Sequence, residues 1–252
     1  MVEEEFSEGT SFIHGLDPRI KIVVTLLFSV VVAVSCNFSA LTAALFLSIF
    51  LVASARLSIS HVGKRLLLAN GLIVFLWVFL PLTYNGETLL VLGPLSLSRE
   101  GVIYALRITL KCNTIVLAMM ATLSTTPVFN LGHAMRELYV PGKIVHLFLF
   151  TYRYIHVIFQ EYMRLTNAMK VRGFVPRSDM HTYRSYAYLV GMLLVRSYDR
   201  AERIHRAMLL RGFNGRYYSL NRFSVGRGDI LYLSGMLIAI LGLVWMQWVL
   251  TI

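Results

Sequence analysis

Long apolar segments constrain the fold of this chain more than any other feature. The longest runs from Ile20 to Ala53 and is interrupted only by Cys-Asn-Phe-Ser at residues 36–39. One transmembrane helix needs about 20 residues, so this run predicts two short spans, at about 20–36 and 39–55. Three further spans are predicted at about 66–82, 100–124 and 229–250. The chain is therefore expected to be an all-α membrane protein with about five transmembrane helices.

Basic residues in short loops set the expected orientation, because such loops tend to stay in the cytoplasm. Arg19 and Lys21 precede the first predicted span, and Arg56, Lys64 and Arg65 follow the second. The link between these two spans carries no basic residue. This pattern places the N-terminus inside the cell, and five spans then place the C-terminus outside.

Two local signals refine the first half of the chain. Asp17-Pro18 predicts a helix start, since Asp is a good N-cap and Pro a good first helical residue. Turn residues at Asn85-Gly86 and Gly93-Pro94 predict a loop between the third and fourth spans, with a small β-hairpin in it.

A basic module separates the last span from the others. Residues 127–229 hold sixteen Lys and Arg against six Asp and Glu, whereas the rest of the chain is nearly neutral. We therefore expect three parts: a membrane domain at 1–126, a cytoplasmic coupling domain at 127–228, and a final transmembrane helix at 229–252. With spans on both sides, lipid headgroups or a peripheral protein are the expected partners of the module, in preference to nucleic acid.

One short motif occurs twice within this module. Residues 167–174 read Asn-Ala-Met-Lys-Val-Arg-Gly-Phe, and residues 206–213 read Arg-Ala-Met-Leu-Leu-Arg-Gly-Phe. Apolar spacing predicts helices at 128–139, 143–172 and 180–211, so each copy ends a long helix. Gly commonly follows a helix, and Arg suits the negative end of the helix dipole. Two equivalent helix ends suggest two copies of a partner, or one partner with two-fold symmetry.

The two long helices leave one alternative open. The stretches Ile144–Phe159 and Tyr186–Val195 are apolar enough to enter the bilayer. If both crossed it, the two copies of the motif would lie on opposite sides of the membrane. We favour an interfacial helical hairpin on the cytoplasmic leaflet, because near-identical motifs should meet similar surroundings.

These features resemble the transmembrane T component of energy-coupling factor (ECF) transporters, the EcfT/CbiQ family, over nearly the whole chain. The resemblance rests on the paired motifs, on the stretch Ser11–Lys21, and on Thr125-Thr126-Pro127 followed by Val140-Pro141. The segment Arg200–Gly215 is most similar to the cobalt and nickel branch, CbiQ above all.

The resemblance implies a scaffold in the inner membrane of a bacterial or archaeal cell. Two cytoplasmic ATPases (CbiO-like) would each bind one motif, through Ala168, Arg172 and Gly173 or through Ala207, Arg211 and Gly212. A CbiM-like substrate-binding S component in the membrane would complete the transporter, with or without a small accessory membrane subunit. The chain itself would need no cofactor, and metal binding would belong to the S component.

Two basic residues lie inside the fourth predicted span, Arg107 and Lys111. Charges inside a membrane are costly and often functional, which makes contact with the S component one interpretation. The other is that their long side chains reach the outer interface or pack against polar neighbours.

Catalytic and metal-binding patterns are missing from the sequence. It has no Gly-x-x-x-x-Gly-Lys-Ser/Thr nucleotide motif, so energy would come from another subunit. Its seven histidines show no tight metal-ligand spacing, and Asp17, Asp179, Asp199 and Asp229 are isolated in sequence. A non-catalytic subunit for cobalt uptake is the favoured interpretation. Nickel or vitamin uptake is the alternative, and a stand-alone secondary carrier the next.

Overall fold

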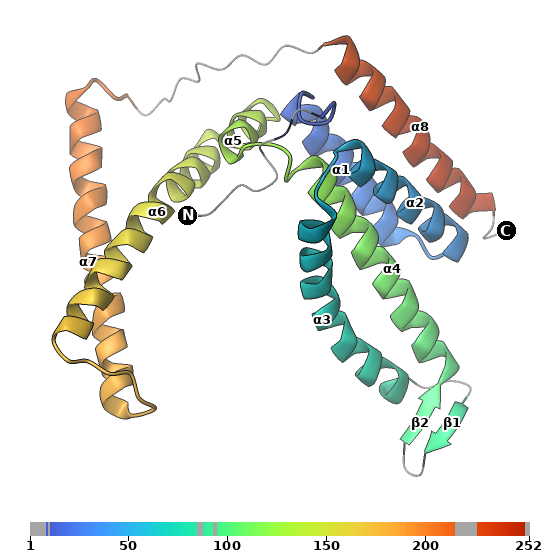
Figure 1. Cartoon of the computed structure of the whole chain (residues 1–252). Coiled ribbons are helices and arrows are strands. Elements are labelled where there is room, and N and C mark those ends of the chain that lie inside the picture. The colour runs from blue at the N-terminus through green and yellow to red at the C-terminus, as the bar shows by residue number, and fades with distance from the viewer. Residues whose placement is uncertain (1–8, 10, 85–87, 93–94, 215–225, 250–252) are drawn as a thin grey trace. The chain divides into compact units, whose positions relative to one another are not determined.

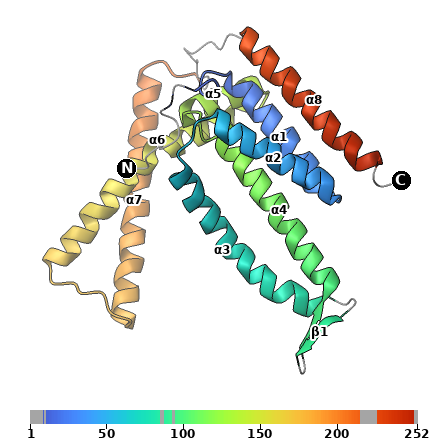
Figure 2. The ribbon, with the colours of Figure 1, turned by 45° about the vertical axis from the view of Figure 1, so that its right-hand side comes forward.

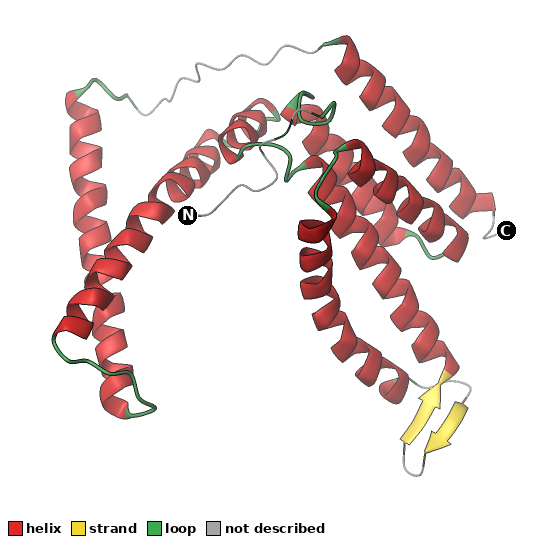
Figure 3. Cartoon of the chain, viewed as in Figure 1, coloured by secondary structure: helices red, strands yellow, loops and turns green. Residues whose placement is uncertain are grey.

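The computed structural model describes residues 9, 11–84, 88–92, 95–214 and 226–249 (Figure 1). Within these ranges the chain forms eight α-helices and one antiparallel pair of strands (Figure 3). The elements are α1 Pro18–Val34, α2 Phe38–Ser54, α3 Ile59–Thr83, β1 Thr88–Leu92, β2 Leu95–Ser98, α4 Arg99–Thr122, α5 Val128–Glu137, α6 Gly142–Val171, α7 Met180–Leu210 and α8 Arg227–Val249. The strands confirm the predicted hairpin, although its turn residues at 85–87 and 93–94 lie outside the described residues.

The predicted class, an all-α membrane protein, is confirmed. The helix lengths distinguish long helices that can cross a membrane from shorter ones. Three helices, α3, α4 and α8, are long and apolar enough to cross a membrane, and α2 is a shorter apolar helix. At the first predicted span the structure has α1, which has 17 residues. The acidic N-terminal residues and the basic segment 215–225 lie outside the described residues.

The chain divides into two compact units, each described here by itself. The bundle unit comprises residues 4–134 and 223–252, and the helical-hairpin unit comprises residues 135–222 with the first three residues. The division of the chain into functional domains at 1–126, 127–228 and 229–252 stays a prediction.

In the bundle unit, α4 lies at the centre. It packs against α1, α2 and α3, while α8 packs against α1 and α2 (Figures 1 and 2). Small buried residues at these contacts, Ala40, Ala44, Ala118 and Ala121, let the helix backbones approach closely. Around them pack Phe28, Val32 and Leu41, all of which are at most 1% exposed.

Polar side chains join the helices of the bundle in pairs. Asn70 of α3 and Asn113 of α4 exchange two amide hydrogen bonds, of 3.0 and 3.1 Å. Further along the same contact, Trp77 donates to the Thr109 hydroxyl at 2.9 Å. Such paired groups stabilise helix contacts where water is excluded, because neither partner is left unsatisfied.

In the helical-hairpin unit, α6 and α7 are joined by residues 172–179 and cross each other (Figure 1). An ion pair between Glu161 of α6 and Arg196 of α7 ties them together, and Glu161 is only 9% exposed. The link ends at Asp179, the N-cap of α7, whose carboxylate accepts from the Thr182 backbone N–H at 2.8 Å.

Candidate partner-docking site

The first copy of the repeated motif forms the C-terminal end of α6. Arg172 is the C-cap, and Gly173 has a φ of +79°, a left-handed conformation that glycine adopts without strain. The Gly173 N–H donates to the Lys170 carbonyl at 3.0 Å, and the Phe174 N–H donates to the Met169 carbonyl at 3.1 Å. These two bonds define a Schellman motif.

The second copy reproduces this geometry at the end of α7. Arg211 is the C-cap, and Gly212 has a φ of +80°. The Gly212 N–H donates to the Leu209 carbonyl at 3.0 Å, and the Phe213 N–H donates to the Met208 carbonyl at 3.1 Å. The prediction that each copy ends a helix, with its Gly just beyond, is therefore confirmed for both.

The shared residues fall into two groups by exposure. In both copies the Met and the Phe are half-buried, whereas the Ala, the Arg and the Gly are exposed. Met and Phe occupy the two positions whose apolar contact commonly accompanies a Schellman motif. The repeat therefore combines an inward pair that shapes the helix end with an outward group that is open to a partner.

An exposed apolar side chain precedes each arginine. Val171 is 88% exposed and Leu210 is 90% exposed. Both are the last residue of their helix. Sequence comparison of the two copies did not single out Val171 and Leu210, because they are different residue types. What they share is an exposed apolar side chain next to the arginine of the motif.

The two motifs lie at opposite ends of the helical-hairpin unit. Arg172 stands at the link between the helices, and Arg211 stands at the far end of α7 (Figure 1). Because α7 has 31 residues and a helix rises about 1.5 Å per residue, α7 is about 46 Å long. Two separate partner surfaces can therefore reach the motifs at the same time.

The second motif also borders a groove that it shares with α6. A groove of about 300 Å³ between α6 and α7 is lined by Phe150 and Tyr154 of α6 and by Ile204 and Met208 of α7. Met208 belongs both to this groove and to the motif that ends α7.

Arg107 and Lys111 are engaged within the bundle unit. The Lys111 ammonium donates to the Ala33 carbonyl, at the end of α1, at 2.6 Å. The Arg107 guanidinium lies 5.3 Å from the ring centres of both Phe38 and Tyr104. These contacts favour packing against neighbours, and contact with an S component stays a prediction.

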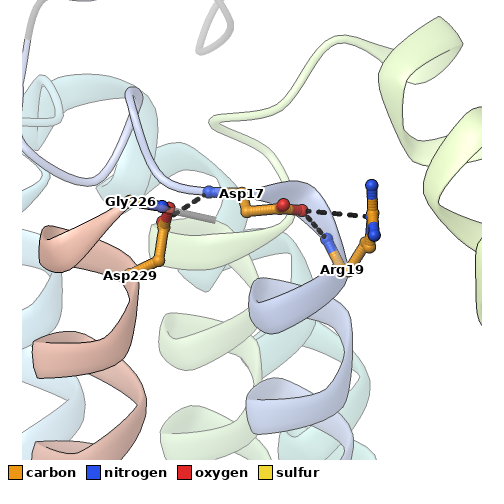
Figure 4. A network of polar contacts seen from close by, with 4 residues as sticks. All are labelled: Asp17, Arg19, Gly226 and Asp229. Carbon is orange, nitrogen blue, oxygen red and sulfur yellow. Dashed lines mark hydrogen bonds and ion pairs between the residues drawn. The ribbon is translucent and has the colours of Figure 1, made fainter. Parts of the chain in front are cut away.

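A polar cluster that sequence reasoning missed joins the first and last helices of the bundle (Figure 4). The Asp229 carboxylate accepts from the backbone N–H of Asp17 at 2.8 Å and from that of Gly226 at 2.8 Å. Asp17 caps α1 by accepting from the Arg19 N–H at 2.9 Å, which confirms the predicted helix start. Asp17 and Asp229, isolated in sequence, are thus brought together by the fold.

Lys21 completes this cluster. Its side chain is fully buried, and its ammonium donates to the Thr126 hydroxyl at 2.9 Å, within the electrostatic field of Asp17 and Asp229. Thr126 lies between α4 and α5. The cluster therefore fixes the start of α1, the start of α8 and the connection that follows α4.

Metal ligands do not gather in the part of the chain that the structure describes. No group of three or more His, Cys, Asp or Glu could hold a metal ion there. On the surface of α7, Glu202 and Arg206 form an ion pair.

Comparisons with known proteins agree with this architecture. The sequence profile of a family described as "Cobalt transport protein" (CbiQ) matches residues 9–220. The chain is 28% identical to the energy-coupling factor transporter transmembrane protein EcfT of Macrococcus caseolyticus, over 85% of each chain. It is 25% identical to the protein of that name from Bacillus subtilis, over 85% of each chain, and 26% identical to that from Lactococcus lactis subsp. cremoris, over 97% of each chain.

Proposed function

The chain belongs to the CbiQ family of cobalt transport proteins, and we propose that it is the non-catalytic coupling subunit of an ECF-type importer. Its helical-hairpin unit binds two cytoplasmic ATPases, one at Arg172 and one at Arg211. The observation that carries this proposal is the pair of helix ends with the same hydrogen bonds, the same exposure pattern and the same exposed arginine.

Each docking site consists of an arginine on a rigid helix end. The guanidinium stays charged at all physiological pH values and can form two parallel hydrogen bonds with a carboxylate. Ala168 and Ala207, one turn earlier, leave room for a partner to approach the helix closely. An acidic groove on each ATPase is the surface that fits such an end.

The bundle unit and the apolar faces of α6 and α7 hold the substrate-binding S component in the membrane. Exposed apolar side chains on these two helices, such as Leu147, Phe159 and Leu194, support this assignment. Movement of the ATPases, passed through α7 to α6, would then reorient the S component.

The substrate is proposed to be cobalt ion, which the family description supports. Nickel or a vitamin is the alternative, because specificity resides in the S component.

Charge reversal at the two arginines tests the docking. Arg172→Glu or Arg211→Glu should reduce the amount of ATPase that co-purifies with the tagged, detergent-solubilised chain, and the double variant should reduce it further. Arg203→Glu is the matched control, since Arg203 is exposed on α7 outside the motif. All variants should insert into the membrane normally. A double variant that still assembles and drives substrate uptake would show that the arginines are not the docking residues.

A further inference from the structure

A second groove lies in the bundle unit, between α3 and α4. Its volume is about 1000 Å³, and its walls are almost entirely apolar. Leu68 and Leu72 of α3 line it and are 83% and 77% exposed, whereas Ile73 and Met120 form a buried floor. Both helices are long and apolar enough to cross a membrane, so this groove opens where lipid is the solvent.

The two ends of the groove differ in polarity. Lys64, Arg65 and Ser124 line one end, and Leu76 and Cys112 line the other. The groove thus has a cationic end followed by an apolar channel. That division matches an amphiphile with an anionic head and a hydrocarbon tail.

The length of the groove matches one leaflet of a bilayer. On each helix its lining extends over about 12 residues, which corresponds to about 18 Å of helix. The hydrocarbon core of a membrane is about 30 Å thick, so one leaflet contributes about 15 Å. A lipid tail lying along Leu68, Leu72 and Leu76 therefore places its headgroup beside Lys64 and Arg65.

We propose that this groove binds an anionic phospholipid, with the phosphate at Lys64 and Arg65 and an acyl chain between α3 and α4. Basic pockets between transmembrane helices on the cytoplasmic side are suited to anionic headgroups. The positive charge at the groove end favours a lipid over a helix of a partner, because an anionic headgroup complements Lys64 and Arg65 whereas an apolar helix surface does not. The site is independent of the proposed ATPase docking.

Native mass spectrometry of the purified full chain tests the headgroup contact. The delipidated protein is titrated with phosphatidylglycerol or with phosphatidylcholine of the same acyl chains. The wild type should retain phosphatidylglycerol roughly tenfold better, because two basic residues face the headgroup. Replacing both, as Lys64→Gln with Arg65→Gln, should bring the ratio close to one. Equal retention of the two lipids by the wild type, or an unchanged preference in the double variant, would overturn the proposal.

Two further variants separate the site from general charge effects. Arg56→Asn removes an exposed cation that does not line the groove, and it should keep the preference for phosphatidylglycerol. Arg56 has a φ of +52°, and Asn tolerates that conformation. Ala69→Phe should fill the channel and reduce retention of both lipids. A photo-reactive side chain at Leu72 should capture lipid in native membranes; capture of a protein chain instead would assign the groove to a partner helix.

Discussion

At the scale of single residues, the repeated motif separates shape from recognition. Its glycines allow the backbone to turn, and its half-buried Met and Phe close the helix end. The exposed face then consists of an arginine beside a large apolar side chain, Val171 in one copy and Leu210 in the other. The arginine contact and the apolar contact should respond differently to salt, because dissolved ions screen the charged contact and leave the apolar one intact.

This difference predicts opposite salt responses for two kinds of variant. Val171→Ser with Leu210→Ser should weaken ATPase co-purification most at high salt, where the apolar contact dominates. Removing the arginines should weaken it most at low salt. Val175→Ser is the control, since Val175 is 65% exposed and follows the motif. If the double Ser variant matches wild type at every salt concentration while the arginine variants fail, the apolar side chains have no part in docking.

At the scale of elements, the start of α7 is fixed by Asp179. Hydrogen bonds from the side chain and backbone of Thr182 hold the pKa of the Asp179 carboxyl below its usual value. Thr182 also accepts from the Arg177 N–H, so one cap orders the link between α6 and α7. That link begins with the first motif, which makes the cap a support of the docking site.

The lowered pKa predicts how this support depends on pH. A carboxyl with a depressed pKa in the folded state stabilises the fold above its unfolded pKa, and that contribution is lost as the pH falls through the folded value. The melting temperature of the wild type should therefore drop more steeply below about pH 4 than that of Asp179→Asn. Asp199→Asn, on the exposed surface of α7, serves as the control. Parallel acid profiles for wild type and Asp179→Asn would contradict this role.

At the scale of the whole molecule, polar contacts hold the last helix of the bundle, α8, at both of its ends. Ser35 and Asn37, between α1 and α2, bond to Gln247 near the end of α8. The cluster of Asp17, Lys21 and Asp229 lies at the opposite end of α1 and α8. From the positive charge in the loops we predict that the end with Asp17, Lys21 and Asp229 faces the cytoplasm and that the end with Ser35 and Asn37 faces outward.

The orientation can be tested with the native cysteines. Cys36 is exposed between α1 and α2, and Cys112 lies within α4. A membrane-impermeant maleimide added to intact cells or spheroplasts should label the chain at Cys36. The signal should disappear in Cys36→Ser and persist in Cys112→Ser. Labelling that requires disruption of the membrane would contradict the predicted orientation.

Sequence reasoning succeeded where the signal is local. Apolar runs, the Asp17-Pro18 start and the glycines after each long helix depend on neighbouring residues, and all correspond to elements in the structure. It missed contacts between distant segments, such as the bond from Asp17 to Asp229, since apolar periodicity does not report which helices pair. It also missed Val171 and Leu210. The two copies of the motif were compared by residue identity, whereas these two residues differ in identity and share only their high exposure.

The bond between Asp17 and Asp229 has a consequence for biosynthesis. The first helix of the bundle meets α8 only after the ribosome has made the entire helical-hairpin unit and the beginning of α8. Until then the Asp17 N–H lacks its acceptor, and buried Lys21 lacks the nearby carboxylate of Asp229. Closure of the bundle is thus the final step of assembly, and we expect truncated chains to expose an unpaired polar cluster that quality-control proteases can recognise.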